Sequence, residues 1–482
     1  MAEHIDSAPG GKPGLITRLA FGVGGAAEGV KNNGFEYFLL LYYSQVLGVS
    51  AGLVAAALMI ALVVDAVSDP VVGYWSDNVR SRIGRRHPFM YGAIIPVTLG
   101  YYFAWNPPAG LSGNELFPWL VAFTIVVRLS FTMFEVPSNA LAAELTDEYD
   151  ERTSLMSFRY FFAWVGGLSI QIALLWVLLV PTEGIEHGFF NLGGWQTYGL
   201  WAAGAIMVAA LLSTAGTHHH IPRLKAAPAK RKLSLGNVFV EIFQTISNKS
   251  FLALFLATLF GLLASGISAS LNQYINGFFW GFTTKQIAGL TVAVYASAVM
   301  ALIVAPLAGR TLGKRRGAII IGFIAFTVAP MPVFLRLLGL MPPNGSELLY
   351  QIVLWVTIVD LALIIATQML MASMVADIVE DSELQTGRRS EGMFFAGISF
   401  IRKLSQAAGV MTAAIILSSA AIQQGMVPSQ VSEASLRSLG WGYAIALITA
   451  WMLMILCVCF YKIGRADHEN NLAALKAKRV PD

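Results

Sequence analysis

Charge is the scarcest property of this chain. Only 12% of its 482 residues are charged and 56% are hydrophobic, whereas soluble domains carry about 25% charged residues. Together with a mean hydropathy of +0.64, this deficit excludes an ordinary soluble domain. It predicts an integral membrane protein.

Cysteine and histidine are scarce as well. The two cysteines, Cys457 and Cys459, lie in one apolar segment and point to different sides of a helix, which favours packing over a disulfide or metal role. The seven histidines all fall in predicted tails or loops, where they form no nucleophile–base or metal constellation. We therefore expect neither an enzyme nor a bound cofactor. Residues 1–13 also lack the apolar core and cleavage site of a signal peptide, so the first span is expected to be retained.

Long apolar runs separated by polar loops predict an all-α membrane protein with twelve spans. The predicted spans are 15–46, 51–76, 88–106, 116–143, 156–181, 196–215, 250–277, 285–309, 316–338, 349–376, 392–422 and 437–462.

Lys and Arg are distributed unevenly between the loops. They cluster in alternate loops, and the opposite loops 107–115, 182–195 and 339–348 contain none. Because cytoplasmic loops carry the excess of Lys and Arg, we expect both termini to be cytoplasmic in a multi-pass protein of a bacterial inner membrane. The net charge of +4 follows from this asymmetry, so no nucleic-acid partner is expected.

The chain repeats itself after six spans. RIGRRH at 82–87 is matched by LGKRRG at 312–317, and an acidic run at 143–152 is matched by one at 376–384. These repeats predict two six-helix domains, 1–215 and 250–465, a cytoplasmic linker at 216–249 and a cytoplasmic tail at 466–482. The linker contains His218, His219 and His220, which could bind a metal but are better interpreted as a solvated loop run.

Two aspartates interrupt the second span. Asp65 and Asp69 are four residues apart, so on a helix they face within about 40° of each other. At about 1.5 Å per residue they lie roughly 18 and 12 Å from the basic loop, deep in a core about 30 Å thick. Buried carboxylates that persist in membranes usually mark an ion or substrate path.

Other charges reach the same depth. The helical rise places Glu135, Lys403, Glu28 and Lys31 about 15–21 Å from cytoplasmic residues of their own helices. Together with Asp65 they make five charges from four helices in one layer, which predicts a common water-filled cavity.

Several of these residues also have structural interpretations. Glu28 and Lys31 are spaced to neutralise each other, and Arg128 and Glu135 share one helix face and could pair. Arg159 lies only about 10 Å deep and is interpreted as an interfacial clamp to a carboxylate. Asp360 is deep but has no obvious partner, so its role, like that of Arg128, stays open.

A hard cation needs several oxygen ligands. Asp65 and Asp69 could supply two of these ligands. Thr132, which lies one turn before Glu135, could supply a third. A buried carboxylate could instead bind a proton. The residues therefore leave Na⁺ and H⁺ coupling both open.

Three stretches carry a family resemblance: DAVSDPVVGYWSDNVRSRIGRRHP at 65–88, PSNALAAELTDEYDERT at 137–153 and ADIVEDSELQTGRRSEG at 376–392. With them the chain resembles, over nearly its whole length, the glycoside–pentoside–hexuronide:cation symporters. These form the melibiose-carrier branch of the major facilitator superfamily. The resemblance implies two pseudo-symmetric six-helix bundles, alternating access, and sugar uptake coupled to Na⁺, Li⁺ or H⁺.

The resemblance also implies roles for particular residues. The family's cation-site carboxylates fall on Asp65 and Asp69, and its fourth-helix threonine falls on Thr132. Its sugar-binding carboxylate, its arginine and its eleventh-helix lysine fall on Glu135, Arg159 and Lys403. Two positions depart from the family, because Gly29 replaces a sugar-binding aspartate beside Glu28, and Asn139 replaces a tryptophan.

We therefore expect a cation-coupled symporter of a sugar, glycoside or hexuronide. The alternative is a sodium-dependent lysophospholipid symporter of the same superfamily branch. Lys403 or Lys31 would favour an anionic substrate. Phe131, Phe134 and Trp164 could pack on a sugar, although as apolar residues they are better interpreted as core. The partners we expect are a small-molecule substrate and membrane lipids, with the protein a monomer.

Overall fold

The computed structural model describes residues 13–146, 148–223, 249–386 and 391–461. Across these ranges the chain is almost entirely helical, and the only extended pairing is one isolated bridge between Thr182 and Ile185. Nine of the described helical segments are long and apolar enough to cross a membrane by length and composition. The prediction of an all-α membrane protein is therefore confirmed.

The described residues group into two compact units. Of the described residues, the first unit comprises 13–146, 148–223, 283–288 and 423–427, and the second comprises 249–282, 289–386, 391–422 and 428–461. The predicted tail 466–482 and most of the predicted linker, 224–248, lie outside the described residues. The predicted domain boundaries stay predictions.

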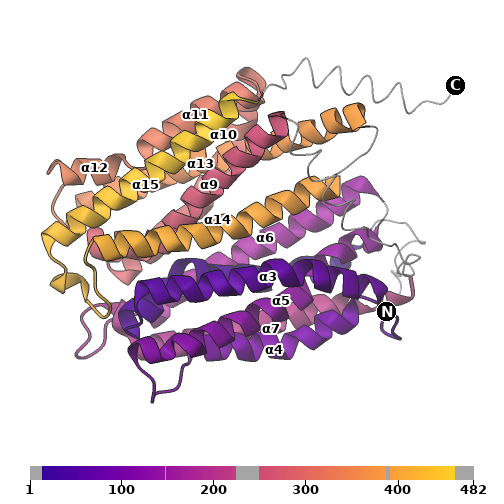
Figure 1. The fold of residues 1–482 in the computed structure, drawn as a ribbon, viewed down its shortest axis with the longest axis horizontal. Helices are drawn as coiled ribbons and strands as arrows, with labels where there is room; N and C mark the ends of the chain where they lie inside the picture. Colours follow the sequence, from indigo (N-terminus) through magenta and orange to yellow (C-terminus); the bar gives the residue numbers. More distant parts are fainter. Residues whose placement is uncertain (1–12, 147, 224–248, 387–390, 462–482) are drawn as a thin grey trace. The chain divides into compact units, whose positions relative to one another are not determined.

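The first unit is built from helices that run side by side, among which α3, α4, α5 and α7 are visible in Figure 1. Its elements are α1 (Leu15–Asn33), η1 (Gly34–Phe38), α2 (Leu39–Leu41), η2 (Tyr42–Val46), α3 (Ala51–Asn78), α4 (His87–Trp105), η3 (Gly113–Leu116), α5 (Phe117–Leu145), α6 (Tyr149–Ala173), η4 (Leu174–Leu178), η5 (Gly188–Phe190), α7 (Leu192–His218) and η6 (Ile221–Arg223).

The second unit repeats this all-helical construction. Its elements are α9 (Lys249–Tyr274), η7 (Ile275–Phe279), α10 (Thr284–Thr311), α11 (Lys314–Val328), α12 (Met331–Leu337), α13 (Glu347–Thr386), α14 (Glu391–Ser419), η8 (Pro428–Gln430) and α15 (Glu433–Cys459). Within it, α9 packs against α14 and α15, and α11 packs against α13.

Helix α3 has two faces that suit a membrane protein. One carries the exposed side chains of Val63, Val67 and Val71, spaced four residues apart. The other carries Asp65 and Ser68, which are 7% and 8% exposed. This is the reverse of a soluble helix, where polar side chains face the solvent. The exposed valines suit lipid, and the aspartate is directed to α5.

Glycines allow α1 and α6 to approach closely. A Cβ atom at Gly25 would overlap the carbonyl oxygen of Arg159, and one at Gly29 would overlap that of Ala163. Small residues four apart are the usual means of close helix contact in membranes. This contact places Glu28 of α1 beside α6. It also leaves no room at Gly29 for the aspartate that the family pattern would put there.

The prediction that His218–His220 form a solvated loop run is wrong for two of the three. His218 ends α7, and its Nδ1 is 3.2 Å from the Tyr91 hydroxyl. His220 is buried, with Nε2 2.9 Å from the Thr17 hydroxyl. His87, also predicted to lie in a loop, is the fully buried first residue of α4. Packing of α7 against α1 and α4 encloses these rings.

Candidate functional site

A shared hydroxyl links the two aspartates of α3 to α5. The Thr132 hydroxyl donates to Oδ1 of Asp65 at 2.8 Å and to Oδ1 of Asp69 at 3.1 Å. A hydroxyl carries one proton, so it can satisfy only one carboxylate at a time. The two carboxylates thus share this one hydroxyl proton, an arrangement that suits a cation or a proton placed between them.

Ser68 adds a further oxygen that sequence reasoning missed. Its hydroxyl lies 3.5 Å from Thr132 Oγ1 and donates to the Asp65 carbonyl at 3.1 Å. The signal was present, because Ser68 is the only hydroxyl side chain near the aspartates in an apolar run. Within the described ranges no group of three His, Cys, Asp or Glu side chains could hold a metal. The hydroxyls of Ser68 and Thr132 add neutral oxygens beside the two carboxylates.

Arg128 contacts the same cluster. Its Nη1 donates to Oδ2 of Asp65 at 3.3 Å, and both side chains are at most 10% exposed. The suggested structural pair of Arg128 with Glu135 is therefore wrong, because the guanidinium reaches across to α3 instead of along its own helix. The geometry leaves Asp65 neutralised in part by a residue of the chain itself.

Glu135 lies among charges from other helices. Glu28, Lys31, Arg159 and Asp65 all act on it electrostatically. The structure thus brings together four of the five charges that the depth argument placed in one layer. Arg128, Thr132, Glu135 and Asn139 are spaced by four, three and four residues and so share one face of α5. On that face Glu135 meets the charges from α1, α3 and α6.

Arg159 holds Glu28. Its Nη2 lies 3.7 Å from Glu28 Oε2, and its Nη1 donates to Ser138 at 2.9 Å. The suggestion that Glu28 and Lys31 simply neutralise each other is therefore wrong, because Glu28 pairs with α6. Only 2% of Arg159 is exposed, whereas the depth predicted for it in the membrane stays a prediction. Arg159 is a clamp, as predicted, but a buried one.

Aromatic side chains complete the surroundings. The Lys31 ammonium lies 4.0 Å from the centre of the Phe131 ring, in cation–π contact. Phe131 and Phe134 are buried, whereas Trp164 is 50% exposed. Asn139 keeps a buried Oδ1 that finds no hydrogen-bond partner among the described residues. A ligand hydroxyl at that point would satisfy it.

Two predicted residues belong to the second unit. Lys403 lies part-buried on α14, and its membership of the site stays a prediction. Asp360 lies on α13 near Tyr443, and its buried Oδ1 has no hydrogen-bond partner in the described part of the chain.

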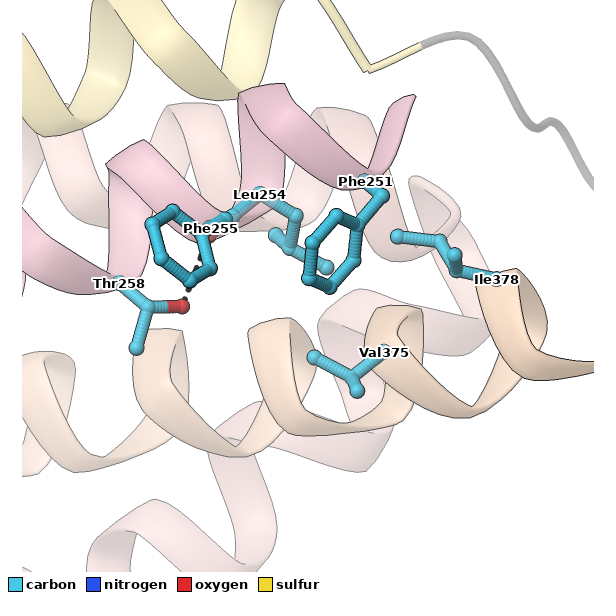
Figure 2. Close-up of a pocket in the computed structure, with 6 residues that line it drawn as sticks. All are labelled: Phe251, Leu254, Phe255, Thr258, Val375 and Ile378. Atoms are coloured by element: carbon cyan, nitrogen blue, oxygen red, sulfur yellow. Dashed lines mark hydrogen bonds between the residues drawn. The ribbon is translucent and has the colours of Figure 1, made fainter. Parts of the chain in front are cut away.

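The second unit also contains a small apolar hollow between α9 and α13, shown in Figure 2. Phe251, Leu254, Phe255, Val375 and Ile378 line it, and the Thr258 hydroxyl there already donates to the Leu254 carbonyl at 2.8 Å. Its volume of about 10 Å³ is at the lower limit for one water molecule. This hollow is too small and too apolar for a sugar.

Comparison with known proteins gives a consistent result. A family model described as MFS/sugar transport protein matches residues 20–465. An uncharacterized symporter of Synechocystis sp. is 26% identical, over 96% of this chain and 97% of its own. The isoprimeverose transporter of Lactiplantibacillus pentosus is 22% identical, over 92% and 88% of the two chains. The sphingosine-1-phosphate transporter MFSD2B of Mus musculus is 25% identical, over 88% and 86%.

Solved structures show the same fold. A bacterial homologue of the human lysosomal transporter Spinster, in an inward-facing and unoccupied conformation, superposes with a TM-score of 0.64. The match covers 97% of this chain and 98% of that one at 14% identity. Together with the family model, this likeness confirms the predicted major facilitator fold.

Proposed function

The chain belongs to the MFS/sugar transport protein family, and on that premise we propose that it couples the uptake of a sugar, glycoside or hexuronide to Na⁺ or H⁺. It is a multi-pass membrane symporter of the major facilitator type and not an enzyme, as its relatives indicate. Our proposal concerns the chemical class of the substrate and the identity of the coupling cation.

The observation that carries the proposal is the Thr132 hydroxyl held between Asp65 and Asp69. The Thr132 hydroxyl can give its one proton to only one of the two carboxylates at a time, and Na⁺ or a proton bound between them would add positive charge at that point. Na⁺ would enter as a transported substrate, with the oxygens of Asp65, Asp69, Thr132 and Ser68 as its ligands. A proton would instead be held by one of the carboxylates.

The proposed substrate residues lie next to this cluster on α5 and α1. Glu135 and Glu28 offer carboxylate acceptors to sugar hydroxyls, which give the stronger, charge-assisted hydrogen bonds. Asn139 offers an unsatisfied oxygen. Lys31 would pair with an anionic group, as a hexuronide carries. Because Asp65 acts electrostatically on Glu135, a cation bound at Asp65 and Asp69 would change the electric field at Glu135.

We test this with uptake into proteoliposomes. A panel of labelled sugars and sugar acids is offered under an imposed Na⁺ gradient, an imposed proton gradient, or neither. We expect at least one compound to accumulate above equilibrium with one gradient and only to equilibrate without it. Accumulation of a compound to the same level with no ion gradient would contradict cation coupling.

A lipid substrate is the second candidate, and it has a specific observation in its favour. The sphingosine-1-phosphate transporter of Mus musculus matches 88% of this chain, and the buried Lys31 ammonium would suit a phosphate headgroup. Ligands that bind the folded state raise the unfolding temperature. Protection of the purified protein by lysolipids, with no protection by any sugar of the panel, would favour the lipid function over ours.

A further inference from the structure

Arg128 has no part in the proposed function, yet it contacts the centre of the proposed cation site. Resting on that function, we propose that Arg128 is a tethered counter-cation: it occupies Asp65 when no cation is bound, leaves Asp65 when the coupling cation binds, and so determines the affinity of the site. The proposal concerns this guanidinium and the monovalent cation with which it competes.

The first support is the charge balance. Asp65 and Asp69 contribute two negative charges around one hydroxyl, and Arg128 contributes one positive charge at Asp65 Oδ2. A cation that binds among Oδ1 of Asp65, Oδ1 of Asp69 and Thr132 Oγ1 would lie on the other side of the same Asp65 carboxylate. It would compete with Arg128 for the negative charge and repel the guanidinium.

The second support is that Arg128 makes few and long contacts with its neighbours. Its contact with Asp65 is 3.3 Å, whereas charge-assisted N–H···O bonds are usually about 2.7–2.9 Å. Its Nε is buried and has no hydrogen-bond partner among the described residues. A guanidinium that carries five donors is therefore using few of them.

A structural arginine of the same unit shows the contrast. Arg86 donates from Nε to Glu144 at 2.9 Å and from Nη1 to Ser76 at 2.8 Å, and it also pairs with Asp77. Arg86 is fixed by three partners from two segments, whereas Arg128 has one long contact and the Phe35 ring 6.0 Å away. Arg128 can leave Asp65 at a lower cost.

The size of the effect follows from general electrostatics. A charge within about 4–6 Å changes the affinity of a carboxylate for a proton by roughly ten- to a thousandfold, and the same field acts on a bound Na⁺. Removal of the Arg128 charge should therefore tighten Na⁺ binding, which is the opposite of what loss of a structural support would do.

The test measures Na⁺ and Li⁺ binding to the purified full-length protein by isothermal titration calorimetry, in detergent and without any sugar. We expect Arg128→Gln to lower the Kd for Na⁺ at least about tenfold. Arg128→Lys keeps the charge and should stay within about threefold of the wild type. Arg336→Gln is the matched control, because Arg336 is another largely enclosed arginine, 14% exposed and stacked 4.1 Å over Phe279 in the second unit. Its substitution should leave Na⁺ binding unchanged.

The outcomes separate the two hypotheses. Gain of Na⁺ binding by Arg128→Gln supports the inference, whether or not the wild type binds measurably. If the wild type binds and Arg128→Gln binds equally or more weakly, the inference is wrong while cation coupling stands. If no variant binds Na⁺ or Li⁺, sodium coupling and the competition of Arg128 with Na⁺ are both wrong, while proton coupling stands. Should Arg128→Gln not fold, Arg128→Met keeps the aliphatic length and carries the same expectation.

Discussion

At the residue scale, the site depends on one hydroxyl that two carboxylates share. Thr132 lies within 3.1 Å of one oxygen from each aspartate, but its hydroxyl holds a single proton. Carboxylates held this close repel each other unless positive charge is shared between them. The same hydroxyl can turn its lone pairs to a cation and its proton to a carboxylate. Cation binding should therefore respond most strongly to a substitution that removes the Thr132 hydroxyl.

Replacing Thr132 by valine removes the hydroxyl while keeping the shape. Groups that hold metal ligands in place typically contribute 10–100-fold to metal affinity, so Thr132→Val should weaken cation binding by about that factor. Thr132→Ser keeps the hydroxyl and should bind nearly as the wild type does. The measurement is the cation-dependent rise in unfolding temperature. Equal rises in the valine and serine variants would contradict a role for the hydroxyl.

The residues of the cluster were only partly predictable. Asp65 and Asp69 stand out because carboxylates in an apolar run are costly, and Glu135 stands out for the same reason. Arg128 was misjudged, because spacing along one helix identifies neighbours on that helix and not a partner on α3. Ser68 was missed because serine is common in membrane helices and its role depends on which helix it faces.

At the element scale, hydropathy located the helices but not their ends. All twelve predicted spans coincide with described helical segments, yet α6 begins at Tyr149 and α13 continues to Thr386. Hydropathy reports which residues prefer hydrocarbon, and a helix can continue past them into water. The first predicted span is interrupted by the π turns η1 and η2, which leave no mark on average hydropathy.

The contact between α1 and α6 gives an element-scale prediction. A methyl group at Gly29 would overlap the Ala163 carbonyl, so Gly29→Ala must separate the two helices. Overpacking typically costs about 1–3 kcal/mol, and a clash with backbone should reach the upper end or prevent folding. Gly204 on α7 has open space around its Cα, so Gly204→Ala is the control. Unfolding monitored in detergent should show a lower free energy of unfolding for Gly29→Ala and an unchanged one for Gly204→Ala. Equal stability of the two variants would contradict the close contact between α1 and α6.

At the scale of the whole molecule, symport requires that two ligands favour the same conformation. Linkage makes the effect reciprocal, so a cation that tightens substrate binding is itself bound more tightly when substrate is present. Asp65 acts electrostatically on Glu135 within the first unit, and the coupling that we propose would use this interaction. The repeat of basic and acidic motifs predicted two similar halves, and packing within each half could not be predicted from it. The expected monomeric state and cytoplasmic termini stay predictions.

The most direct measurement compares accumulation with exchange in proteoliposomes containing Asp65→Asn or the wild type. Asparagine keeps the size of the side chain but removes the charge that we propose couples the cation. We predict that the variant exchanges labelled for unlabelled substrate across the membrane and does not accumulate it, even with the Na⁺ or proton gradient that drives the wild type. Full gradient-driven accumulation by Asp65→Asn would contradict the coupling role of the aspartate pair.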